Sequence, residues 1–134
     1  MPSCVLVADR HHELTDGVRR LLESAFGTVV MVADAASLLE GAGRMQPEVA
    51  IVDLSLSREG GLAWLTAIRA RCPGLMVIVL SVHDEQAVRR AVLAAGADEF
   101  VLKRRLATDL LPAVARLRAA GVAAHGLGGG SKPE

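Results

Sequence analysis

The sequence predicts an α/β fold in which helices cover both faces of a parallel β-sheet. Short apolar segments alternate with segments of helical spacing five times along the 134 residues. The apolar segments show no alternation with polar residues, which is typical of strands that are buried on both faces. Right-handed crossovers between parallel strands then put helices on both sides of the sheet. The length fits a single domain with a packed core.

The expected strands are the five short apolar runs. They comprise residues 4–8, 28–32, 49–52, 75–80 and 99–102, and the third run ends at Asp53. Aromatic residues are scarce in the chain, so these runs must pack mainly through Val, Leu, Ile and Ala. We therefore expect an aliphatic core on each face of the sheet.

The expected helices lie between the strands, where apolar residues recur at spacings of three and four. They run from Leu14 to about Ala25, over residues 35–42, from Leu62 to before Pro73, over residues 84–95, and from Leu106 to about Leu117. Residues 121–134 are rich in Gly and are expected to form a flexible tail or linker. The folded domain is accordingly expected over residues 1–120.

The composition narrows the classes of partner. Acidic and basic residues balance at a formal net charge of zero, so charge gives no reason to expect binding to nucleic acid or to a membrane. We expect no leader sequence, and no apolar stretch has membrane-spanning length. Cys4 and Cys72 lack the spacing of a metal site, and a reducing cytoplasm is the expected location.

Four polar side chains follow the expected strands. Ligands of open parallel α/β sheets bind at the carboxyl ends of the strands, and there the chain has Asp9, Asp53, Ser81 and Lys103. A carboxylate is able to attack a phosphoryl group, and a second carboxylate is able to hold Mg²⁺. A hydroxyl and an ammonium group bind phosphoryl oxygens and offset their charge. The set therefore indicates phosphoryl chemistry.

Three segments resemble the receiver domains of two-component signalling. They are residues 49–56 (VAIVDLSL), 77–84 (VIVLSVHD) and 95–103 (AGADEFVLK), which occur in the family's order and with its usual spacing. The resemblance covers residues 4–120 and is nearest to receivers of regulators that carry a LuxR-type DNA-binding domain. It implies a flavodoxin-like (βα)5 three-layer sandwich whose parallel sheet has the strand order 2-1-3-4-5.

The resemblance also implies a role for each polar residue. Asp53 becomes the phosphorylation site, at which an aspartyl phosphate forms, and Lys103 pairs with the phosphoryl group. Ser81 becomes the hydroxyl that turns inward to a phosphoryl oxygen. Phe100 stands at the aromatic switch position. Mg²⁺ is the implied cofactor, and its implied ligands are Asp9 through water, Asp53, and the backbone carbonyl of Ser55.

Arg10 departs from the family pattern. It stands where relatives have the acid that binds the metal directly, and a guanidinium cannot ligate Mg²⁺. We therefore expect the affinity for Mg²⁺ to fall sharply. Two arrangements remain open at this point. Arg10 pairs with Asp53 and holds the site in a metal-independent state, or it turns to solvent and leaves Asp9 as a weak metal site.

Further departures follow Asp53 and Lys103. Ser57 replaces a usual Pro and Gly60 a usual Asp, although Gly61 is kept, so we expect a less rigid loop. Arg104 and Arg105 follow Lys103 where many relatives have Pro, and they add positive charge near the site or at the start of the last helix.

The favoured function is a phosphorylation-controlled switch, not an enzyme. A histidine kinase or a phosphotransfer protein donates the phosphoryl group. The surface of the fourth helix, fifth strand and fifth helix then docks an output protein or a second copy. The alternative is a pseudo-receiver, an interaction module that works without phosphorylation because of Arg10. A flavodoxin-like cofactor protein is disfavoured, because residues 9–13 form no Gly-rich phosphate loop and Tyr is absent.

Overall fold

Five parallel strands form the centre of the molecule. The computed structural model describes residues 3–10, 15–57 and 61–131. Its strands are β1 (Cys4–Ala8), β2 (Thr28–Val32), β3 (Val49–Asp53), β4 (Met76–Ser81) and β5 (Glu99–Leu102). Their order in the sheet is β2-β1-β3-β4-β5, and every neighbouring pair is parallel. The predicted fold class and strand order are therefore confirmed.

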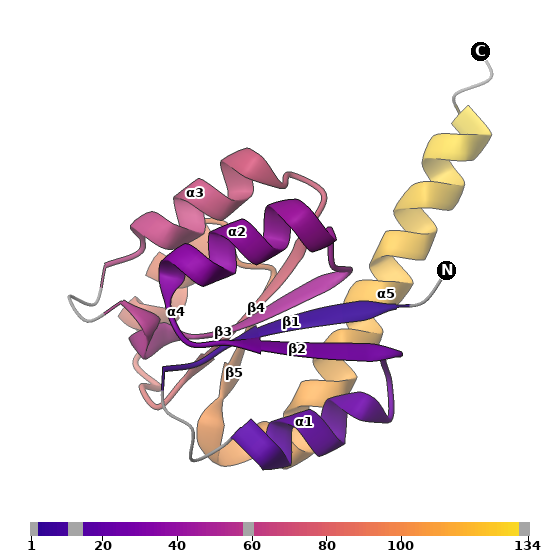
Figure 1. Cartoon of the computed structure of the whole chain (residues 1–134). Coiled ribbons are helices and arrows are strands. Elements are labelled where there is room, and N and C mark those ends of the chain that lie inside the picture. Colours follow the sequence, from indigo (N-terminus) through magenta and orange to yellow (C-terminus); the bar gives the residue numbers. More distant parts are fainter. Residues whose placement is uncertain (1–2, 11–14, 58–60, 132–134) are drawn as a thin grey trace.

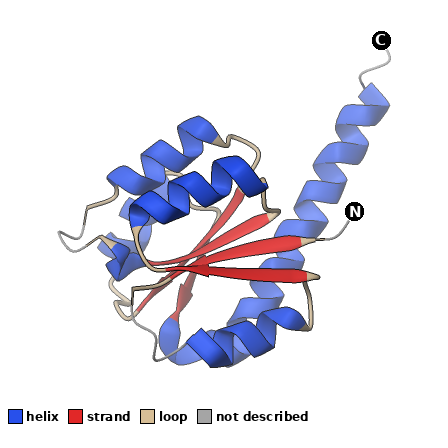
Figure 2. Ribbon diagram, viewed as in Figure 1, coloured by secondary structure: helices blue, strands red, loops and turns tan. Residues whose placement is uncertain are grey.

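Helices cover the sheet on both faces (Figures 1 and 2). They are α1 (Thr15–Glu23), α2 (Ala35–Met45), α3 (Ala63–Arg71), α4 (Gln86–Ala94) and α5 (Leu106–Ser131). Short 3₁₀ turns, η2 (Leu54–Leu56) and η3 (Lys103–Arg105), follow β3 and β5. Because both turns begin where a strand ends, they lie at the carboxyl edge of the sheet.

Two separate apolar cores hold the three layers together. One core packs side chains such as Leu6 and Val52 against α2, α3 and α4, and the other packs Val5, Val7 and Ile51 against α1 and α5. Successive residues of one strand therefore enter opposite cores, as the pleat of a strand requires. This arrangement explains why the strands are apolar without alternation.

The end of α2 differs from the prediction. Asp34 caps the start of this helix, because its carboxylate accepts a hydrogen bond of 2.7 Å from the backbone N–H of Ser37. The helix does not stop near Gly43 but continues to Met45, where Gln46 takes a left-handed conformation with φ of 49°. The Gln46 N–H donates to the carbonyl of Ala42 and closes the helix. Gly43 thus lies inside the helix, which tolerates it at a modest cost.

The last helix also differs from the prediction. α5 continues past Leu117 to Ser131, and Figure 1 shows it projecting beyond the sheet. Alanines occupy much of residues 119–124, and their high helix propensity favours continuation past Gly121. The flexible tail or linker expected over residues 121–134 stays a prediction. The division of the chain at residue 120 into domain and linker stays a prediction.

Two sequence expectations fall on residues outside the described ranges, namely the helix start at Leu14 and the loop departure at Gly60. Within the described ranges, no helix is long and apolar enough to cross a membrane.

Candidate phosphoacceptor site

The carboxyl edge of the sheet brings the predicted polar residues together. Asp9 directly follows β1, Asp53 and Ser81 end β3 and β4, and Lys103 opens η3. Asp9, Asp53 and Ser81 are only 7%, 2% and 1% exposed, and they are the buried polar residues of the described part of the chain. Burying a charge is costly unless the charge is paired, so a cluster of this kind marks a functional edge.

Asp53 forms an ion pair with Lys103. One carboxylate oxygen, Oδ2, accepts a hydrogen bond from Lys103 Nζ. The other oxygen, Oδ1, accepts from the backbone N–H of Ser55 at 2.9 Å and from the Ser55 hydroxyl at 3.0 Å. The β3 strand and the η2 turn therefore hold the carboxylate in a fixed orientation.

The pKa of Asp53 reflects two opposing influences. Burial raises the pKa, but hydrogen bonds from Lys103 and Ser55 and the positive charge of Lys103 outweigh burial and hold it below its ordinary value. The Asp9 side chain also contacts this carboxyl group and lowers its pKa. Asp53 is therefore ionised at neutral pH, which is the state that a nucleophilic carboxylate requires.

The Ser81 hydroxyl is bound to the loop that follows β4. Its Oγ accepts from the backbone N–H of His83 at 2.9 Å and donates to the carbonyl of the same residue at 3.2 Å. Residues Asp53 and Leu80 are paired across β3 and β4, so Ser81 ends the strand next to the one that carries Asp53. The inward turn of this hydroxyl toward a phosphoryl group stays a prediction.

A pocket of about 540 Å³ opens beside Asp53. Its wall includes Arg10, Ser81 and Lys103, together with the apolar side chains Leu54, Leu62, Val82, Val88 and Val92. Arg10 is exposed, and within the described part of the chain it makes no ion pair with Asp53 or with another acid. Of the two arrangements left open by the sequence, the pairing of Arg10 with Asp53 is therefore not the one adopted, since Lys103 occupies that position.

Most of the chain matches one known protein family. The family model described as the response regulator receiver domain matches residues 5–115. The chain belongs to the response regulator receiver family. Receiver domains partner with histidine kinases and with output domains.

Individual relatives of this receiver are regulators of the LuxR family. The nitrate/nitrite response regulator protein NarP of Escherichia coli is 34% identical over 115 residues, which are 84% of this chain and 54% of NarP. The chain spans about half the length of the curated relatives that it matches.

Solved structures share the fold of this receiver. The isolated receiver domain of RcsB from Salmonella enterica serovar Typhimurium, solved with the phosphomimetic BeF3⁻, has a TM-score of 0.78 and 29% identity over 89% of this chain and 90% of its own. A LuxR-family two-component response regulator from Aurantimonas sp. SI85-9A1 has a TM-score of 0.80 over 90% of this chain and 87% of its own. At 24% identity, the second likeness shows the fold alone.

The acidic residues that the structure describes at this edge do not make a full metal site. Receiver domains generally bind Mg²⁺ at the phosphorylation site. Here Arg10 stands in place of one acid, and one oxygen of Asp53 is bound to Lys103. The described residues contain no group of three or more His, Cys, Asp or Glu that could hold a metal ion. With two carboxylates opposed by two cations, the edge of this sheet does not fit a divalent cation well.

Phe100 lies in the core at the expected switch position. Its side chain is 7% exposed and belongs to the apolar core to which residues of α2, α3 and α4 also contribute. The Arg89 guanidinium of α4 lies over the ring, 5.7 Å from its centroid. The predicted rotation of this ring between buried and exposed states stays a prediction.

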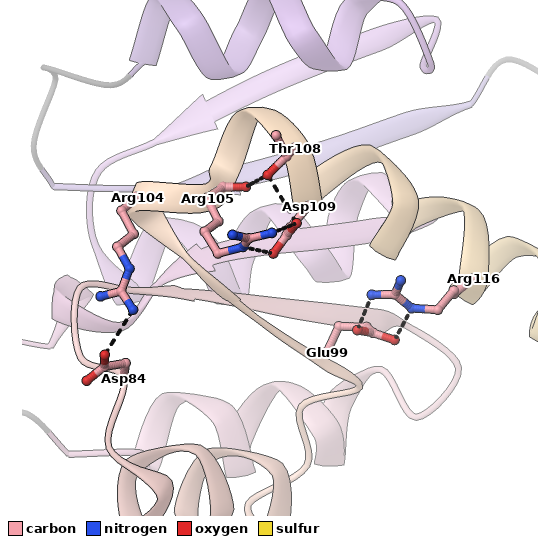
Figure 3. A network of polar contacts seen from close by, with 7 residues as sticks. All are labelled: Asp84, Glu99, Arg104, Arg105, Thr108, Asp109 and Arg116. Carbon is pink, nitrogen blue, oxygen red and sulfur yellow. Dashed lines mark hydrogen bonds and ion pairs between the residues drawn. The ribbon is translucent and has the colours of Figure 1, made fainter.

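One ion pair near the receiver's site was not foreseen. Arg104 of η3 donates to Asp84 in the loop between β4 and α4 at 2.9 Å, and Figure 3 shows it bridging the two segments. From the sequence, Arg104 was expected only to add positive charge. Both residues follow the ends of neighbouring strands, and this shared position is the signal from which their proximity could have been predicted.

Proposed function

We propose that this receiver takes a phosphoryl group on Asp53 from a histidine kinase or a phosphotransfer protein and so changes a protein-interaction surface. The observation that carries the proposal is a buried, ionised Asp53 that borders an open pocket and contacts Lys103. Burial leaves this carboxylate with one accessible side, so a donor approaches it through the pocket.

The transfer forms one bond and breaks one bond. A carboxylate oxygen of Asp53 attacks the phosphorus of a phosphohistidine. The P–N bond breaks, its electron pair goes to the imidazole nitrogen, and that nitrogen takes up a proton from solvent. Lys103 moves from the carboxylate to a phosphoryl oxygen and offsets its charge. The product is an acyl phosphate on Asp53.

The new phosphoryl group then competes for the Ser81 hydroxyl. Ser81 gives up its two hydrogen bonds to His83, and the loop before α4 is released from its present position. That loop also carries Asp84, the partner of Arg104, so its shift reaches η3 and the start of α5. The surface of α4, β5 and α5 changes in response.

The proposed partner of this surface is a protein in the cytoplasm: an output domain or a second copy of the chain. A formal net charge of zero supports a protein partner for this domain over nucleic acid. The domain is proposed to act as a phosphoryl acceptor and not as an enzyme. No observation on the described residues favours the pseudo-receiver alternative.

The test is direct phosphorylation by small donors. The protein is incubated with acetyl phosphate or phosphoramidate, and intact mass spectrometry measures the gain of one phosphoryl group. We expect the gain in the wild type, its loss in Asp53→Asn, and its retention in Asp16→Asn, which changes an exposed acid of α1. A gain that persists in Asp53→Asn, or no gain in the wild type with either donor, would contradict the proposal.

A further inference from the structure

Two acidic and two basic side chains meet at the carboxyl edge of the sheet. The acids are Asp9 and Asp53, and the bases are Arg10 and Lys103. An acid at position 10 would remove one positive charge and add one negative charge, a difference that a divalent cation would balance. With arginine at this position, the protein itself supplies that positive charge.

Arg10 is placed to meet an incoming phosphoryl group. It lines the pocket that Asp53, Ser81 and Lys103 also line. Its side chain makes no ion pair or hydrogen bond within the described ranges, whereas Lys103 is engaged by Asp53 and Arg104 by Asp84. Arg10 is thus a pocket cation with no acidic partner among the described residues. A guanidinium presents a planar fork of donors that matches two phosphoryl oxygens.

We propose that Arg10 takes the place of the divalent cation, so that this receiver accepts a phosphoryl group on Asp53 without a metal ion. The inference rests on the proposed function, because it concerns the same acceptor. Arg10 and Lys103 bind the phosphoryl oxygens from two sides of the pocket as the phosphorus approaches Asp53.

The step balances without a metal. With acetyl phosphate as the donor, an Asp53 oxygen attacks the phosphorus, and the bond from phosphorus to the bridging oxygen breaks. The electron pair leaves on acetate, which departs as an anion, so no proton has to move. The product carries the phosphoryl charge between Arg10 and Lys103.

The experiment compares labelling with acetyl phosphate in EDTA and in Mg²⁺, followed by intact mass spectrometry. We expect the wild type to label at rates within about twofold of each other in the two conditions. Arg10→Asp should label only with Mg²⁺, and Arg10→Lys should keep metal-free labelling. Arg10→Ala should label about a hundredfold more slowly in EDTA, since one donor to the developing charge is lost. Arg44→Ala is the matched control, because Arg44 is an exposed arginine of α2 that does not line the pocket.

A second readout does not depend on phosphorylation. Isothermal titration with Mg²⁺ alone should give no binding to the wild type and measurable binding to Arg10→Asp. Circular dichroism of each variant verifies that the fold is kept, as expected for an exposed side chain.

The outcomes separate this inference from the proposed function. Wild-type labelling that needs Mg²⁺ overturns the inference and leaves the proposed function standing. A wild type that never labels, beside an Arg10→Asp variant that labels with Mg²⁺, overturns both for the native chain and identifies Arg10 as the cause. If neither protein labels, the proposed function itself fails.

Discussion

Replacing Lys103 by Met removes the partner of a buried carboxylate. It directly tests the assignment of Lys103 as the ion-pair partner of Asp53. The Lys103 and Asp53 side chains are 13% and 3% exposed, so the pair lies largely out of water. Breaking a buried ion pair by removing one partner costs about 3–5 kcal/mol. Asp53 keeps two hydrogen bonds from Ser55 and borders an open pocket, so we expect Lys103→Met to lower the free energy of unfolding by about 2–3 kcal/mol at pH 7.

The pH dependence of this variant has a definite sign. In the wild type the pKa of Asp53 is lowered, so its contribution to stability is present above the unfolded-state pKa and is lost as the pH falls through the folded-state pKa. Without Lys103, its hydrogen bond and its positive charge no longer lower the pKa of Asp53, so this pKa rises relative to the wild type. The ionised carboxylate is then less well stabilised in the fold, so the deficit of Lys103→Met should shrink as the pH falls through the folded-state pKa of the variant.

Urea denaturation followed by circular dichroism measures the effect. With a slope of about 1–3 kcal/mol per molar urea, the expected loss lowers the midpoint by about 0.7–3 M. The double variant Asp53→Asn/Lys103→Met should recover much of the loss, because no buried charge remains without its partner. A loss below about 1 kcal/mol at pH 7, or no recovery in the double variant, would refute the assignment of Lys103 as the partner of a buried, ionised Asp53.

Three other predictions concern the frame around the site. Gly96→Ala should destabilise the domain by about 1–3 kcal/mol in thermal unfolding. The φ of Gly96 is +123°, and an added Cβ would lie 2.8 Å from a side-chain atom of α3. The control Gly43→Ala, at a helical position with open space around it, should stabilise the domain by about 0.5–1 kcal/mol. Arg104→Ala should raise the pKa of Asp84, measured by carbon-detected NMR, since the Arg104 hydrogen bond lowers it; an unchanged pKa would show that the pair is absent in solution. Ser81→Ala should still be phosphorylated on Asp53, but the NMR chemical shifts of α4 should no longer change on phosphorylation. If they still change, the Ser81 hydroxyl does not couple phosphorylation to α4.

The fold could be predicted from the sequence because its strands are buried on both faces. An unbroken apolar run such as 49–52 has few other interpretations once helices flank it, and the strand positions were confirmed to within a residue or two. The helix ends were harder to predict. A glycine suggested a helix end near Gly43, but one glycine inside a helix costs too little to end it when Arg44 and Met45, which favour helix, follow. Helix propensity does not explain why the backbone stays helical through the glycine-rich residues 126–130.

The members of the site were predictable, but their pairing was not. Strand ends identified Asp9, Asp53, Ser81 and Lys103, because parallel strands deliver their following residues to one edge. Asp53 could pair with Arg10 or with Lys103, and the choice depends on the backbone conformation at the ends of β1 and β5. The spacing of residues in the sequence does not predict this conformation. The same holds for Arg118 of α5, whose guanidinium lies 4.3 Å from the centroid of the Phe26 ring and pairs with Glu48, residues distant in the sequence.

The pairing of acids with bases at the sheet edge affects how a signal would leave this domain. Phosphorylation of Asp53 would add negative charge beside Arg10 and Lys103, and the surrounding salt would screen this charge beyond about 10 Å. Phosphorylation would then affect the surface through movements of loops and side chains, as the hydrogen bonds between Ser81 and His83 and between Arg104 and Asp84 rearrange. A partner docked on α4, β5 and α5 would respond to a change in the shape of that surface. The effect of phosphorylation on its binding would therefore vary little between dilute and concentrated salt.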